Sequence, residues 1–140
     1  MKKASLCEDF CYQSIDGKAL KKCDIHSEDS NSTYESGNYY TDKNVARNNI
    51  RADTLMRKLR RFAAEHDGCV APKDIFGCCY CILWDRVNHV LFPLAKNNVS
   101  AFSICFHTQK AAEAAIEEFH DELIWYFTEY DPMPEGWWEE

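Results

Sequence analysis

The chain has 140 residues, and apolar residues make up 46% of it, which excludes general disorder and predicts one domain with a buried core. No apolar run is long enough to span a bilayer, and the start lacks the apolar segment of a secretory signal. We therefore expect a soluble protein of the cytoplasm.

The net charge of −7 is unevenly distributed. Residues 1–106 hold 15 basic against 13 acidic side chains, whereas residues 107–140 hold one lysine against ten acids. An acidic C-terminal end repels nucleic acid and suits a basic partner surface. A solvated helix face that merely keeps the protein soluble gives the same pattern.

The first segment, residues 1–27, holds a Cys-x3-Cys pair followed by a Cys-x2-His pair. In a reducing cytosol, metal ligands or buried thiols are favoured over disulfides. A helix over residues 5–13 would place the first pair on one face, and the turn signal Asp16-Gly17 would bring the two pairs together. Three thiolates and one imidazole make a closed, structural Zn²⁺ site. The predicted ligands are Cys7, Cys11, Cys23 and His26.

Other cysteines offer alternatives to this set. A rival metal site would draw on Cys69, Cys78, Cys79 and Cys81, although strand alternation points Cys78 away from its two neighbours. We expect these residues, with Cys105, to be small buried hydrophobic side chains. Two further interpretations stay open: thiols that bind no metal, and a mixed site in which one of these cysteines completes the N-terminal set.

Residues 28–48 are polar and rich in serine and asparagine, which predicts a linker or long loop before a domain of residues 49–140. Helical spacing of apolar residues predicts a helix over residues 49–66, ended by Asp67-Gly68. Its opposite face is basic, which fits either phosphate contact or simple solvation. The apolar face holds Ala52, Leu55, Met56, Leu59, Phe62 and Ala63, and the basic face Arg51, Arg57, Lys58, Arg60 and Arg61.

Three strand candidates, residues 77–85, 89–95 and 99–107, predict an antiparallel meander. Pro93 indicates a bulge or a free edge in the middle segment. Thr108 is a good N-cap for a long helix that runs to Tyr130 and covers the sheet. The acids along this helix form the predicted partner-binding surface, which comprises Glu113, Glu117, Glu118, Asp121, Glu122 and Glu129.

These elements define an α+β fold: a zinc-stapled N-terminal segment, a helix, a three-stranded antiparallel sheet and a long C-terminal helix. Catalysis finds little support, because no cysteine stands in a nucleophile motif, the histidines are isolated and no glycine loop would cradle phosphate. We therefore expect a binding protein and not an enzyme.

The stretch "FHTQKAAEAAIEEFHDELIWYFTEYDPMPEGWW" resembles the C-terminal part of small uncharacterised proteins from phages and mobile elements of Gram-positive bacteria. The basic stretch "ADTLMRKLRRFAAEH" is similar to the segment that often precedes it, so the resemblance covers roughly residues 50–140. The pattern carries no catalytic residues, so the resemblance implies an origin in a phage or mobile element and says little about mechanism. The N-terminal Cys/His segment departs from it.

This resemblance implies an anti-CRISPR protein of a bacterial host cell, since small acidic mobile-element proteins include inhibitors of Cas9 and some of these bind metal. In this interpretation the acidic surface binds a basic groove of a Cas9-type nuclease and blocks the loading of nucleic acid. The alternative is a zinc-stabilised regulatory or adaptor module of a mobile element that binds another protein or a nucleic acid through Arg51 to Arg61. The third interpretation, a thiol enzyme, requires a reactive cysteine of low pKa.

Overall fold

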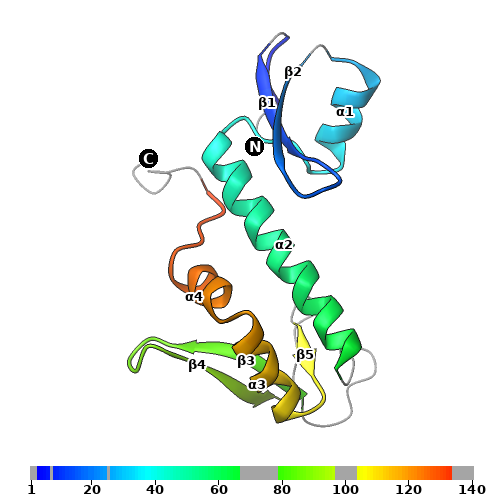
Figure 1. The fold of residues 1–140 in the computed structure, drawn as a ribbon. Coiled ribbons are helices and arrows are strands. Elements are labelled where there is room, and N and C mark those ends of the chain that lie inside the picture. Colours follow the sequence, from blue (N-terminus) through cyan, green and yellow to red (C-terminus); the bar gives the residue numbers. More distant parts are fainter. Residues whose placement is uncertain (1–2, 7, 25, 67–78, 97–103, 134–140) are drawn as a thin grey trace. The chain divides into compact units, whose positions relative to one another are not determined.

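The computed structural model describes residues 3–6, 8–24, 26–66, 79–96 and 104–133. They form two compact units: residues up to Thr54 together with those that follow Tyr130, and Leu55–Tyr130. Helices and antiparallel strands occur together, which confirms the α+β class. The elements in chain order are β1 (Asp9–Gln13), β2 (Ala19–Cys23), α1 (Glu28–Glu35), α2 (Lys43–Glu65), β3 (Cys79–Asp85), β4 (Val90–Lys96), β5 (Cys105–Phe106), α3 (Gln109–Glu118) and α4 (His120–Thr128) (Figure 1).

In the first unit, β1 and β2 form an antiparallel hairpin. Its turn places Gly17 at φ +81, a left-handed conformation that favours glycine, so the turn predicted at Asp16-Gly17 is confirmed. The helix considered for residues 5–13 is wrong, because residues 9–13 form β1. Alternation explains the strand: Phe10 packs against Tyr39 on one side, and Cys11 lies in a separate cluster with residues of α2.

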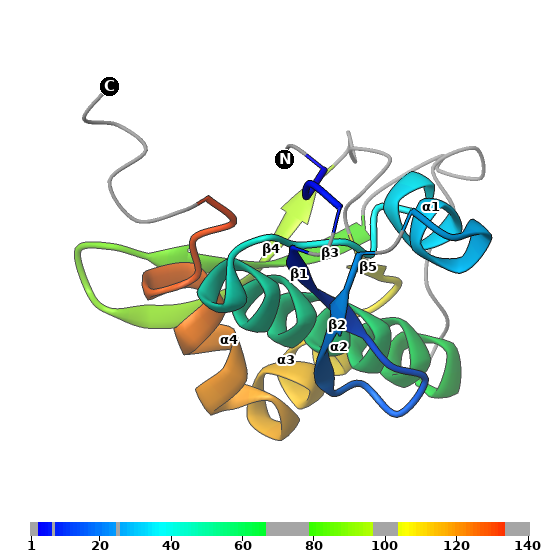
Figure 2. The same ribbon diagram turned by 90° about the horizontal axis from the view of Figure 1, so that it is seen from above.

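The polar segment 28–48 is not the simple loop that its composition predicts. It contains α1, which lies beside the β1–β2 hairpin (Figure 2), and the start of α2. The Ser27 hydroxyl accepts a hydrogen bond from the Ser30 amide and caps α1, while the Asp42 carboxylate accepts from the amides of Asn44 and Val45 and caps α2. Serine and aspartate are typical both of loops and of N-caps, so composition did not separate the two.

In the second unit the strand order is β4-β3-β5, with both pairs antiparallel. The three-stranded antiparallel sheet is confirmed, but the meander is wrong, because β5 pairs with β3 and not with β4. The free edge inferred from Pro93 is correct, since Pro93 lies on the edge strand β4 in a continuous register without a bulge. Proline lacks an N–H for a second neighbour, which suits β4 to the edge. Of the predicted third strand, residues 99–103 lie outside the described residues.

Helix α3 packs across the sheet (Figure 1) and closes the core of this unit. On β3, the side chains of Tyr80, Ile82 and Trp84 pack against this core, whereas Cys79 and Cys81 belong to a separate cluster on the opposite face. The apolar face predicted for the helix over residues 49–66 is confirmed in α2. The buried core residues are Leu55, Leu59, Ala63, Leu91, Phe106, Ala111, Ala112, Ala115 and Leu123.

The long C-terminal helix is not confirmed, because the backbone leaves helical geometry at Phe119, with φ −111 and ψ 25, between α3 and α4. Two like-charge pairs at i, i+4 spacing, Glu117 with Asp121 and Glu118 with Glu122, span this point and disfavour a continuous helix. Asp121 and Glu122 lie in the first turn of α4, where their negative charge complements the positive end of the helix dipole. No proline or glycine stands at the break, and the two like-charge pairs oppose a continuous helix by a few tenths of a kcal/mol each.

Candidate metal centre

Three cysteine sulfurs converge in the second unit, from two neighbouring strands. Cys79 and Cys81 lie on β3 and Cys105 on β5, and their sulfur atoms all lie within 4.8 Å of one another. The exposed fractions of the three residues are 1%, 7% and 0%. Within the described part of the chain, no other group of three or more Cys, His, Asp or Glu residues brings its ligand atoms this close.

The register of the sheet produces this arrangement. Cys81 stands directly opposite Cys105, and the two sulfurs are 3.0 Å apart. Cys79 is two residues earlier on β3, so it lies on the same face of the sheet. Its Sγ is 3.6 Å from the backbone carbonyl oxygen of Lys96, the residue opposite it on β4. All three thiols therefore lie on one face of the sheet, two from β3 and one from the two-residue strand β5.

The donor set fits a soft divalent metal ion. Zinc binds thiolate sulfur at about 2.3 Å in a tetrahedron, which places its sulfur ligands about 3.8 Å apart. The observed spread, from 3.0 Å to at most 4.8 Å, brackets that value, so small rotamer changes suffice to seat an ion. Three sulfurs leave one position of the tetrahedron to a further ligand; Cys69 and Cys78, the remaining cysteines of the rival set, lie outside the described residues.

Electrostatics favours the neutral thiol of Cys105 until a cation arrives. Burial raises the pKa of the Cys105 thiol well above its ordinary value, and the neighbouring thiols of Cys81 and Cys79 raise it further. A buried anion without a counter-charge is costly, so a metal ion would supply the charge that lets Cys105 ionise. Metal binding at this centre therefore releases protons and strengthens as the pH rises.

The described members of the N-terminal set are Cys11, Cys23 and His26. Cys11 is buried beside Ala46 and Ile50, Cys23 is half-buried at the end of β2, and His26 is exposed. These three do not form a group with converging ligand atoms in the described structure. Cys7 lies outside the described residues, so the four-ligand N-terminal site stays a prediction.

The predicted partner-binding acids occupy α3, α4 and the residue that follows α4. Glu113, Glu117, Glu118, Asp121 and Glu129 are exposed, and Glu122 is half-buried. Glu113 accepts a hydrogen bond from the Gln109 side chain, and Asp121 lies 3.2 Å from the Nδ1 atom of His120. The break at Phe119 distributes this acidic surface over two short helices instead of one long one.

Sequence reasoning correctly placed Cys79, Cys81 and Cys105 in the interior but missed their convergence. The Cys-x-Cys spacing on a strand was visible and indicates two thiols on one face. The third member was hidden by the predicted meander, which set the strand of Cys105 against β4 instead of β3. A correct strand order would have revealed the centre.

Comparison with protein-family models, with curated proteins and with solved structures finds no match for this chain. Among the helices that the structure describes, none combines the length and the apolar character needed to cross a bilayer.

Proposed function

We propose that this chain is a zinc-stabilised binding protein, not an enzyme, that inhibits a Cas9-type nuclease in the cytoplasm of a bacterial host. The observation that carries the proposal is the exposed acidic surface of α3 and α4, at Glu113, Glu117, Glu118 and Asp121. Closely spaced carboxylates resemble the charge of a nucleic-acid backbone and are attracted to the basic channel that holds guide and target strands. Occupation of that channel would block nucleic-acid loading.

The role proposed for zinc is structural. Thiolates from β3 and β5 at one ion would join two strands whose described pairing is short, since β5 comprises only Cys105–Phe106. Bound structural zinc contributes on the order of 10 kcal/mol to small folds, far more than two residues of strand pairing. The ion would hold β5, and thereby the start of α3, in place.

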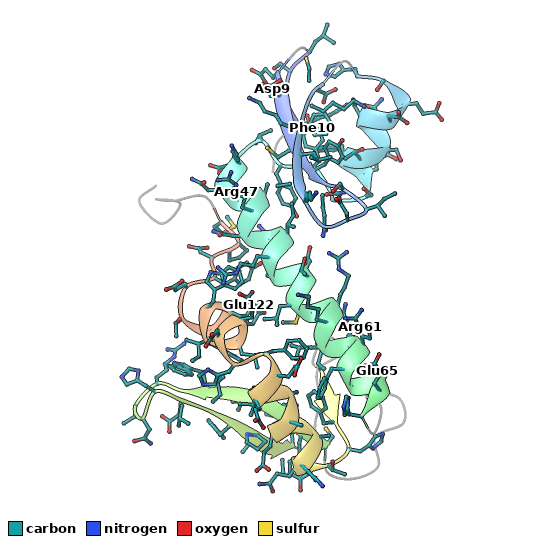
Figure 3. All side chains as sticks on the ribbon, viewed as in Figure 1. Asp9, Phe10, Arg47, Arg61, Glu65 and Glu122 are labelled. Atoms are coloured by element: carbon teal, nitrogen blue, oxygen red, sulfur yellow. The ribbon has the colours of Figure 1, made fainter. Side chains whose placement is uncertain are left out.

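A charge-reversal variant tests the binding proposal. We expect Glu113→Lys/Glu117→Lys/Glu118→Lys to weaken binding to purified Cas9 by roughly tenfold or more at moderate salt, because three attractive contacts become repulsive. Binding is measured by interferometry and inhibition by target-DNA cleavage. The matched control, Glu35→Lys/Asp53→Lys/Glu65→Lys, changes the net charge equally at exposed positions elsewhere and should bind like the wild type. Figure 3 marks Glu65 near the end of α2.

Two outcomes would contradict the proposal. Wild-type protein that neither binds Cas9 nor reduces its DNA binding would exclude this partner. Equal weakening in both triple variants would show that net charge, and not the surface of α3 and α4, governs binding.

A second candidate function rests on α2. Its side chains Arg57, Lys58, Arg60 and Arg61 are exposed in the second unit, and Arg61 is marked in Figure 3. A regulatory or adaptor module would use such a stripe to contact phosphates. A gel-shift assay with DNA alone separates the two functions, because the inhibitor has no need of affinity for free DNA.

Metal content tests the zinc proposal. We expect elemental analysis of the wild type to find zinc, and Cys79→Ser or Cys105→Ser to lower it by one equivalent, because each removes a ligand of the centre. Cys11→Ser tests the predicted N-terminal set in the same assay, since it removes a buried thiol of the first unit. Zinc lost from Cys11→Ser but kept in both other variants would support the N-terminal set and refute the centre on the sheet.

A further inference from the structure

The pair Cys81 and Cys105 has the arrangement of a dithiol that closes into a disulfide. Directly opposed residues of an antiparallel pair have Cα atoms about 4.5–5.5 Å apart, within the range that a disulfide bridges. The two sulfurs already lie 3.0 Å apart, and neither Cys81 nor Cys105 is joined in a disulfide here. Cys79 and Cys81 are poorer partners, because i, i+2 residues of one strand lie about 6.5–7 Å apart.

Access to the pair differs between its two members. Cys81 contributes to the lining of a cavity of about 220 Å³, together with Leu83, Lys96 and Ile104, whereas Cys105 has no exposed surface. A small oxidant that enters this cavity therefore meets Cys81 first. Cys105 is positioned to act second, from the adjacent strand.

We propose that the metal centre is redox-regulated: oxidation by a low-molecular-weight disulfide joins Cys81 to Cys105 and expels the metal ion. The inference deepens the proposed zinc site and rests on it for the metal, but the dithiol itself needs only the strand register. Formation of the bond consumes two of the three sulfur ligands. Cys79 is then the last of the three described sulfur ligands, and the tetrahedral set is lost, so the metal-bound and disulfide states exclude each other.

The exchange balances in two steps. The sulfur of Cys81 attacks one sulfur of the oxidant, forms a mixed disulfide and releases the first small thiolate. The sulfur of Cys105 then attacks the Cys81 sulfur, forms the protein disulfide and releases the second small thiolate. The oxidant gains two electrons, the two cysteines lose two, and any zinc leaves as the dication while solvent protonates Cys79 and the released thiolates.

The test uses the full chain, reduced and loaded with zinc, and dithiodipyridine as the oxidant. A chromogenic chelator follows zinc, absorbance follows the released pyridinethione, and mass spectrometry of unreduced peptides locates the bond. We expect one zinc released and two pyridinethiones produced at this centre for each Cys81–Cys105 disulfide. Dithiothreitol with added zinc should restore the starting state.

Variants separate the dithiol from the metal. Cys79→Ser should lack zinc at the centre yet still form the Cys81–Cys105 bond. Cys105→Ser should stop at a mixed disulfide on Cys81, and Cys11→Ser should leave formation of the Cys81–Cys105 bond unchanged. Zinc bound at the centre without any Cys81–Cys105 disulfide on oxidation would overturn this inference and leave the zinc proposal standing. A disulfide formed by a chain that never holds zinc there would refute the zinc proposal and retain the dithiol. A bond from Cys79 to either partner would overturn the pairing.

Discussion

At the scale of single residues, the first unit depends on a buried carboxylate that sequence patterns gave no reason to expect. Asp24 has no exposed surface; its carboxylate accepts hydrogen bonds from the Tyr39 hydroxyl at 2.6 Å and from the His26 amide at 2.7 Å. The Tyr39 oxygen in turn accepts from the Ala4 amide at 2.9 Å. Phe10 stacks on the Tyr39 ring, with centroids 4.3 Å apart. This network therefore joins Asp24, which directly follows β2, to Ala4 in the segment that precedes β1.

Removal of the Tyr39 hydroxyl measures how much this hydrogen-bond network contributes to the free energy of unfolding. Tyr39→Phe keeps the ring but takes from Asp24 the donor that most strongly lowers its pKa. We expect the free energy of unfolding at pH 7 to fall by about 1–3 kcal/mol, the usual cost of removing a buried hydrogen bond to a charged acceptor. Urea unfolding measures it. Tyr34→Phe is the control, because Tyr34 is partly exposed and contacts Tyr39 only edge to face.

The same pair predicts a pH dependence. The pKa of Asp24 is lowered in the fold, so its stabilisation is complete above the ordinary aspartate pKa and is lost as the pH falls through the lower folded value. Burial and the bond to Asp24 raise the pKa of Tyr39 to about 12, so stability also declines as the pH rises from about 10 towards that value. The difference between wild type and Tyr39→Phe should therefore shrink as the pH falls below the ordinary aspartate pKa of about 3.9. A difference that stays constant throughout acid unfolding would exclude Asp24 as its source.

At the scale of elements, the start of α2 shows how a cap decides where a helix begins. Apolar periodicity located this helix from residue 49, whereas it begins at Lys43, directly after Asp42. No acid stands in the first turn, so Asp42 alone supplies both the acceptor for two backbone amides and the negative charge that favours a helix N-terminus. Asparagine offers the same acceptor without the charge.

Substitution of this cap gives a prediction of its own. Asp42→Ala should destabilise the protein by about 1 kcal/mol, and Asp42→Asn by less, because asparagine is a comparable N-cap. Thermal and urea unfolding measure both variants. Loss of the same amount in Asp42→Asn would assign the effect to charge instead of to the hydrogen bonds.

Some elements were predictable because their pattern is carried by residues near one another in sequence. The apolar stripe from Leu55 to Ala63 predicted the helix that is α2, and the strand patterns of the next segments predicted β3 and β4. The first turns of α2, the helix α1 and the break at Phe119 depend on capping and on charge pairs, which apolar periodicity does not register. Local patterns therefore gave the types of the larger elements but not their ends.

At the scale of the whole molecule, local sequence patterns did not predict the order of the strands in the three-stranded sheet. A short turn made the β3–β4 pairing evident, and the Asp85 side chain supports that turn through the amides of Val87 and Asn88. The partner of β5 depends on tertiary packing, which brings Phe106 opposite Tyr80. The candidate metal centre depends on this pairing, so its burial was predictable and its assembly was not.

Strand order also sets the sequence of events in folding. The β3–β4 hairpin closes a short loop, whereas Cys81 and Cys105 are 24 residues apart in the chain, so β5 must close a much longer loop at greater entropic cost. We expect the hairpin to form early with Cys79 and Cys81 ready on one face, and β5 to dock afterwards. An ion bound first by the sulfurs of Cys79 and Cys81 would gain its third sulfur ligand, Cys105, only when β5 docks. Complete coordination would then coincide with the last folding step of the second unit.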